Sequence, residues 1–145
     1  MPLLPRKGVL AIAAVVDVAL QADAHPISAK ELASRHGLPP RHLEPVLQAL
    51  VRDGILRGVR GPRGGYALAR ERRRVTADDI LRAAGTVDGS EKPHRGSELL
   101  NSTVLPALAK AEEEFGVALS RINVEDMARI AQRLNKHAAR PVART

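Results

Sequence analysis

Apolar residues recur at helical spacing near the start of the chain. Val9, Ile12, Val16 and Leu20 lie three or four residues apart, and this period predicts an amphipathic first helix. A secretory signal is the alternative interpretation, because basic residues precede the apolar run and a segment resembling a cleavage site follows it. Asp17 interrupts the run, so the helix is preferred. The run is also too short to span a bilayer, and we expect a cytoplasmic protein.

A second, short helix is predicted after a loop. The segment from Ser28 to Glu31 has the form of a capping box, in which Ser28 caps the helix and the Glu31 side chain reaches back to it. This helix places Leu32 and Ala33 toward the core. It stops at Gly37, a residue that can take the left-handed conformation found after helices.

A third helix is expected from Pro40 or Arg41 to Asp53, with Gly54 as its stop. Pro45 has two interpretations, since it either lies in the first turn, where the missing N–H costs little, or kinks a helix that begins earlier; the first is preferred. The predicted buried stripe has spacings of three and four and consists of Leu43, Val46, Leu47 and Leu50. Two helices joined by so brief a turn indicate a helix-turn-helix.

Two short apolar segments, 55–60 and 66–69, are predicted as strands of a hairpin. The glycine-rich loop 61–65 between them supplies residues that accept positive φ. A hairpin directly after a helix-turn-helix is a wing. Beyond it, Thr76 and Asp79 form a second opening like a capping box, weakened by Asp in place of Glu, for a short helix that ends at Gly85.

The segment 86–101 mixes Gly, Pro, Ser and both charge signs without a period, which predicts a loop. A long helix is expected after it, capped by Ser102 or Thr103 so that Pro106 falls in the first turn. Its apolar positions follow a short heptad spacing through Val104, Leu108, Ala111, Phe115, Ala118 and Ile122.

A final helix is predicted from Val124 to about Lys136, with Asn123 as its cap. One face of this helix is expected to carry Met127, Ile130, Ala131 and Leu134. A basic tail, 138–145, is predicted to be disordered.

Composition narrows the chemistry that 145 residues can support. The chain has no cysteine, which excludes disulfides, thiolate zinc sites and cysteine-ligated clusters. One Phe, one Tyr and no Trp make a platform for stacking single-stranded bases hard to build. Between Arg52 and Arg74, eight arginines against Asp53 and Glu71 give +6 of the formal net +7. The local charge indicates a contact surface for duplex nucleic acid or an acidic membrane.

Side chains near the start of the third helix are the candidates for reading bases in a major groove. Arg41 can bind guanine, His42 a base or a phosphate, and Glu44 can accept from a cytosine amino group. For Glu44, a solvated charge favoured by the helix dipole is the alternative interpretation. The alternative interpretation for Arg41 is likewise a solvated side chain that makes no contact with DNA.

The wing supplies the second group of candidates. Arg63 lies at the tip of the glycine turn, where it can enter a narrow minor groove, and Arg57 and Arg60 flank it as phosphate or groove contacts. The alternative is a charged edge that prevents strand pairing. The whole predicted DNA-binding set is Lys7, Ser28, Arg41, His42, Glu44, Arg57, Arg60 and Arg63.

No enzyme, cofactor or metal site is expected. The five histidines fall in separate segments without a metal-ligand spacing on one helix, and no nucleophile motif is present. The glycine loop lacks the pattern of a phosphate-binding loop and is followed by a strand rather than a helix.

Four segments together resemble a known family. RKG near the start, LEPVLQALVRDGIL, VRGPRGGYALAR and VTADDILRAAG are similar to the bacterial winged-helix regulators of the Rrf family, the IscR, NsrR and CymR type. The match runs from about Lys7 to Gly85. In such proteins the residues that match Arg41, His42 and Arg60, and also Glu44, lie at the DNA.

The resemblance implies a homodimer formed by crossing the long helices, so the heptad positions named above become the predicted dimerisation surface. The expected fold is mainly α, with a winged helix-turn-helix, a two-stranded antiparallel wing and a long dimerisation helix. The predicted units are a DNA-binding domain over 1–85, a sensor-like loop over 86–101, and the long and final helices over 102–137.

Many members of the family hold an iron–sulfur cluster through three cysteines in the loop that corresponds to 86–101. This chain offers Ser90, His94, Ser97 and Ser102 instead, and such clusters need thiolates. We therefore expect a cluster-free homodimeric regulator, most simply a repressor, that binds a partly palindromic duplex and answers to an unknown small-molecule or protein effector. The alternatives are a winged-helix protein-interaction module with non-specific DNA affinity and, less favoured, a protein that binds a membrane surface.

Overall fold

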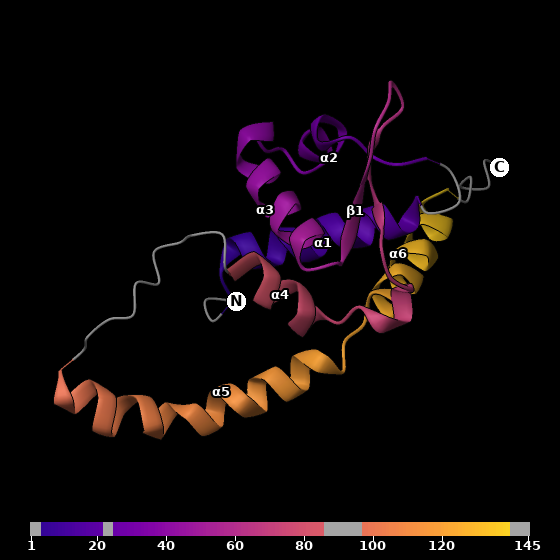
Figure 1. Cartoon of the computed structure of the whole chain (residues 1–145). Coiled ribbons are helices and arrows are strands. Elements are labelled where there is room, and N and C mark those ends of the chain that lie inside the picture. Colours follow the sequence, from indigo (N-terminus) through magenta and orange to yellow (C-terminus); the bar gives the residue numbers. More distant parts are fainter. Residues whose placement is uncertain (1–3, 22–24, 86–96, 140–145) are drawn as a thin grey trace.

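The computed structural model describes residues 4–21, 25–85 and 97–139. These residues form a helical body with a two-stranded antiparallel wing and a long helix lying to one side (Figure 1), which confirms the expected fold class. The elements are α1 (Arg6–Leu20), α2 (Ala29–Arg35), α3 (Pro40–Arg52), β1 (Leu56–Val59), β2 (Gly65–Leu68), the 3-10 turn η1 (Arg72–Arg74), α4 (Ala77–Gly85), the π-helical segment η2 (Leu100–Val104), α5 (Leu105–Ser120) and α6 (Val124–Ala139).

Helix α1 lies in the centre of the body and packs against α4, α6 and the wing. The predicted amphipathic helix is confirmed, and two of the apolar residues that predicted it, Ile12 and Val16, are partly buried against the core. Val9 is 46% exposed. The buried positions include Ala11, Ala14, Val15 and Val18. Small side chains let α4 approach closely, as at Gly8, where an added methyl group would overlap Leu81. Alanine and glycine add little to a hydrophobic pattern, which explains why the most deeply buried positions of this helix did not stand out in the sequence.

The ends of α2 and α3 follow the expected chemistry, with one exception. Ser28 Oγ accepts from the backbone N–H of Glu31 at 3.1 Å, as a cap should. The Glu31 carboxylate, however, pairs with Arg35 at 2.9 Å, so the reciprocal half of the predicted capping box is replaced by an ion pair. Gly37 and Gly54 take φ of 64° and 75° and end their helices as predicted.

The preferred placement of Pro45 was wrong. Because α3 begins at Pro40, Pro45 lies in the second turn and inside the helix. Its ring cannot donate to the carbonyl of Arg41, one turn earlier. Arg41 is exposed, so solvent reaches this part of the helix. The buried stripe of α3 is as predicted, with Ala49 added to it.

The wing is fastened to the body by a third segment. Strand β1 pairs with β2 in the register Leu56 to Leu68 and Val59 to Gly65. Ile27 extends the pairing, since Tyr66 donates to its carbonyl at 2.8 Å and its own N–H donates to the Tyr66 carbonyl at 3.1 Å. Gly65 makes this approach possible, because a methyl group there would overlap the Ile27 backbone.

Two backbone hydrogen bonds join the segment after the wing to the junction between α5 and α6. Ala77 donates to Ile122 and Val124 donates to Val75, each at 2.8 Å. Beside this joint, Thr76 and Asp79 form a complete capping box with two hydrogen bonds of 3.1 Å. The expected weakening by Asp is therefore not seen in the hydrogen-bond pattern.

The long helix begins earlier than expected. Helical structure starts at Glu98, and Ser97 Oγ accepts from the N–H of Leu100 at 3.2 Å. The cap is thus Ser97 and not Ser102 or Thr103, and the predicted loop can extend no further than Ser97. Pro106 lies in the first turn of α5, as predicted, but this turn directly follows the π-helical segment η2. Most of the predicted loop, 86–96, and the tail 140–145 lie outside the described residues.

Helix α6 packs on α1 through a face that includes Met127 of the predicted apolar face but not Ile130 or Leu134. Val124 and Ala128 are buried in the core, and Met127 packs at its edge. Ile130 and Leu134 are 52% and 64% exposed. Asn123 caps the helix as predicted, with Oδ1 accepting from Asp126 at 2.9 Å. In the described part of the chain, no helix has both the length and the apolar run needed to cross a membrane.

Candidate nucleic-acid interface

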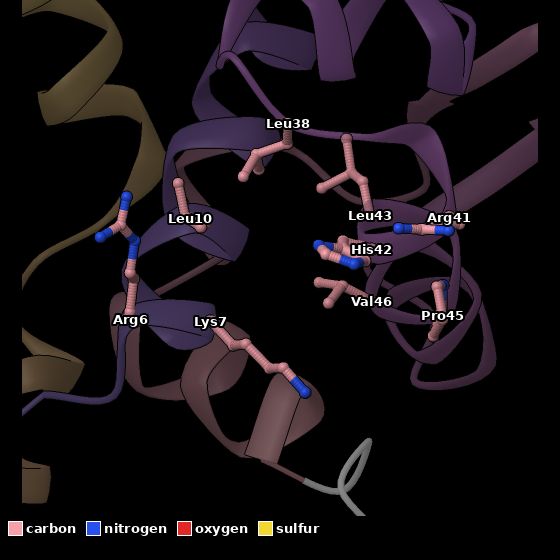
Figure 2. A pocket seen from close by; sticks show the side chains of 9 residues that line it. All are labelled: Arg6, Lys7, Leu10, Leu38, Arg41, His42, Leu43, Pro45 and Val46. Carbon is pink, nitrogen blue, oxygen red and sulfur yellow. The ribbon is translucent and has the colours of Figure 1, made fainter.

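The first turns of α3 present three of the predicted contact residues to solvent. Arg41, His42 and Glu44 are all exposed, because the stripe facing the core occupies the other side of the helix. Lys7, at the start of α1, is exposed beside them. Figure 2 shows Lys7, Arg41 and His42 around a cavity between the two helix starts.

The tip of the wing carries the second group. Arg60 and Arg63 are exposed beyond the end of β1. Arg63 and Ser28 line one hollow of about 480 Å³ between the wing and the start of α2, together with His25, Pro26, Glu31, Pro62 and Gly64. The Ser28 oxygen accepts from the helix backbone, which leaves its hydroxyl hydrogen to donate to a phosphate oxygen.

Arg57 is placed differently from the other wing arginines. It pairs in register with Ala67 and lines a smaller hollow of about 200 Å³ against the end of α1, with Val18 and Gln21. The structure therefore does not bring Arg57 together with the arginines of the wing tip.

Four of the eight arginines in the basic segment bind groups of the protein itself. Arg70 donates to the carbonyls of Asp53 and Gly54 at 2.8 and 3.1 Å, at the C-terminal end of α3. Arg72 pairs with Glu125 on α6 at 3.0 Å. Arg73 and Arg74 pair with Glu71 at 3.0 and 3.8 Å. The charge count thus overstated the contact surface, because Arg70 and Arg72 bind other elements of the body and Arg73 and Arg74 pair with the nearby Glu71.

The two candidate groups share one side of the molecule. Figure 1 shows α2, the first turns of α3 and the wing tip on one side of the body, and α5 on the opposite side. All six predicted dimerisation residues of the long helix are exposed in the single chain. Arg6 and His25 line the two hollows but were not predicted; for Arg6 the signal was present, since it precedes Lys7 at the helix start.

The serines of the long helix do not fit an iron–sulfur cluster. Ser97 Oγ accepts from the Leu100 backbone, and Ser102 Oγ donates to the Glu98 carbonyl at 2.5 Å, so both serve the helix. Hydroxyl groups are also hard donors, unlike the thiolates that clusters require. Among the described residues, no three His, Cys, Asp or Glu side chains gather to hold a metal. Ser90 and His94 lie outside the described residues.

Comparisons with known proteins agree on one family. Residues 4–130 match the model of Rrf2, an iron-dependent transcriptional regulator. The HTH-type transcriptional regulator IscR of Yersinia pseudotuberculosis is 27% identical over 146 residues, which cover 94% of this chain and 89% of that protein.

Solved structures show the same fold. IscR of T. potens aligns with a TM-score of 0.68 at 30% identity, covering 88% of this chain and 87% of that one. CymR, the global cysteine regulator of B. subtilis, aligns with a TM-score of 0.65 at 24% identity, covering 88% of this chain and 96% of that one.

Proposed function

The chain belongs to the Rrf2 family of transcriptional regulators, which are not enzymes, and on that premise we propose that it is a cytoplasmic, cluster-free homodimer that represses transcription from a partly palindromic operator. The observation that carries the proposal is the division of the surface between two opposite sides. Cationic and hydrogen-bonding side chains from α3 and the wing tip share one side, and an exposed apolar helix lies on the other.

In the proposed complex, the start of α3 enters a major groove and the wing follows the backbone into the adjacent minor groove. Arg41 and Glu44 read base edges, and His42 binds a base or a phosphate. Lys7, Ser28 and Arg60 bind phosphates, and Arg63 follows the narrow groove. Arg57 makes a lesser contribution, since it faces the end of α1.

The dimer is proposed to form through α5 and its flanking residues, because all the predicted dimerisation residues are exposed in the single chain. Leu108, Phe115 and Ile122 are all more than one third exposed. A two-fold dimer presents its two recognition helices with the same symmetry, so the operator should be an inverted repeat.

A cluster-free protein follows from the donor groups that the chain carries. The sequence has no cysteine, and the two described serines of the corresponding segment are engaged in the helix. The Rrf2 family is described as iron-dependent. A chain without a cluster would have to respond to an effector other than the state of an iron–sulfur cluster.

Selection of bound fragments from genomic DNA tests the proposal, followed by binding titrations at several salt concentrations. We expect one inverted repeat, preferred over random duplex by about 10³-fold or more. A double variant, Arg60→Ala with Arg63→Ala, should lower the salt slope of the dimer by up to about four units, because each of its two subunits loses two arginines. Arg73→Ala is the matched control, because Arg73 pairs with Glu71 on the body. Sequence-blind binding that disappears at moderate salt would favour a protein-interaction module instead.

A further inference from the structure

A cavity of about 530 Å³ lies between the first turns of α1 and those of α3. Its apolar wall consists of Leu10, Leu38, Leu43, Pro45 and Val46. Its basic rim consists of Arg6, Lys7, Arg41 and His42. None of the nine lining residues is acidic. The cavity therefore combines an apolar interior with an edge that favours negative charge.

Figure 2 shows how these side chains are arranged. His42 and Val46 point from α3 across the cavity toward α1, while Leu10 and Leu38 close the opposite wall. Lys7 extends along one edge, and Arg6 and Arg41 lie at two outer sides. An anion held near His42 and Lys7 would place an attached apolar body between the leucines.

The walls belong to parts of the fold that are fixed before any ligand arrives. Leu38 is held by a hydrogen bond from its N–H to the carbonyl of Ala33 at 2.9 Å, directly after the left-handed Gly37. Gly8 packs against Leu81 and fixes the start of α1 on α4. A preformed cavity binds a small molecule without ordering a loop, so little of the binding energy is lost.

We propose that this cavity binds a small amphipathic organic anion, with one carboxylate or sulfonate and an apolar body of roughly ten carbon atoms. The anionic group contacts the basic rim, and the body fills the space between Leu10, Leu38 and Val46. Three of the rim residues, Lys7, Arg41 and His42, belong to the predicted DNA-contact set. An occupied cavity therefore neutralises charge at the DNA surface and weakens operator binding. This coupling rests on the proposed function, whereas ligand binding does not.

Calorimetric titration of the full chain without DNA tests the site, with hexanoate, octanoate and decanoate as probes below their micelle concentrations. Affinity should increase about fourfold for each added CH₂ group, since each buries further in the apolar interior. We expect one molecule per chain. Decanol, which keeps the chain but lacks the charge, should bind roughly tenfold or more weakly than decanoate. Decyltrimethylammonium should bind more weakly still.

Two pairs of variants locate the bound probe. Leu10→Trp fills the cavity and should abolish decanoate binding, while Val9→Trp, at the adjacent exposed position, should leave it unchanged. Arg6→Gln should weaken binding, and Arg129→Gln, on the surface of α6, should not. Circular dichroism establishes that each variant is folded.

Several results would overturn the site: no decanoate binding, equal affinity for decanol, or unchanged binding in Leu10→Trp. Competition by inorganic phosphate as strong as by decanoate would assign the rim to phosphate contact alone. The coupling is tested separately, since decanoate should release operator DNA from the parent chain and not from Leu10→Trp. Release from both, or from neither, would refute it. A chain that binds no operator but binds decanoate would refute the proposed function and leave the site intact.

Discussion

Replacement of Leu108 by Ala tests whether α5 forms the dimer. Leu108 belongs to the predicted dimerisation surface and is 58% exposed in the single chain. Ala favours helix more than Leu does, so α5 itself should remain helical. The substitution therefore removes apolar surface without removing the element that carries it.

The size of the effect follows from the exposed fraction. Full burial of a leucine side chain stabilises by about 1.5 to 3 kcal/mol. If the dimer covers what remains exposed, each Leu108 contributes roughly 0.9 to 1.7 kcal/mol, and a two-fold dimer contains two of them. The dimer dissociation constant should then rise roughly 15- to 300-fold.

Sedimentation equilibrium over a range of concentrations measures this constant directly. Val117→Ala is the matched control, because Val117 is 46% exposed on the same helix but lies outside the heptad positions. Its dissociation constant should stay within about threefold of the parent, since its exposed surface is not covered. A dissociation constant unchanged in Leu108→Ala, or raised equally in both variants, would refute a dimer built on these positions.

Four further predictions test the interface and the fold. Glu44→Ala should relax base preference at one position of each half-site, seen by titrating operator variants, while the salt slope stays unchanged. Gly65→Ala should destabilise the chain by more than about 1 kcal/mol in urea unfolding, because the methyl group meets the Ile27 backbone; Gly58→Ala, whose added methyl meets open space, is its control. Asp79→Ala should cost about 0.5 to 2 kcal/mol in the same assay, because it removes half of the capping box. Anaerobic incubation with iron and sulfide should give no visible cluster absorbance, and DNA binding should be indifferent to oxidants; cluster absorbance would refute the cluster-free proposal.

The elements of this fold could be predicted from local signals, since each depends on residues close in sequence. Glycines ended α2 and α3 at Gly37 and Gly54, and the Thr76 and Asn123 caps opened α4 and α6 where expected. These signals are strong because a helix end needs a specific backbone conformation or a side-chain acceptor.

The sequence predictions failed where packing between segments distant in sequence determines which residues are buried or paired. The most deeply buried positions of α1 were missed because they include small residues such as Ala11 and Ala14, whose burial depends on how closely other elements approach. Arg70 and Arg72 were counted in the basic segment because their partners, the end of α3 and Glu125, are distant in sequence. Pro45 was assigned to a first turn because that position is the least costly for proline, yet it lies in the second turn of a helix that begins at Pro40.

In the candidate site, too, some features follow from local sequence signals and others depend on long-range packing. Residues at the start of α3 and at the wing tip could be named from sequence, because a helix-turn-helix followed by a hairpin places them on the surface. The cavity beside α3 could not be foreseen, since it depends on how far the starts of α1 and α3 stand apart. The different position of Arg57 likewise follows from the contact of the wing with the end of α1.

The hydrogen-bonded joint between Val75 and Val124 bears on how a dimer would select the spacing of two half-sites in DNA. It connects the chain leaving the wing to the junction between α5 and α6, with one backbone hydrogen bond on each side of Thr76. In the proposed dimer, the crossing angle of the two long helices would then set the distance between the two wing tips. A partner acting on α5 would change the preferred spacing of the half-sites, and the bases read within each half-site would stay the same.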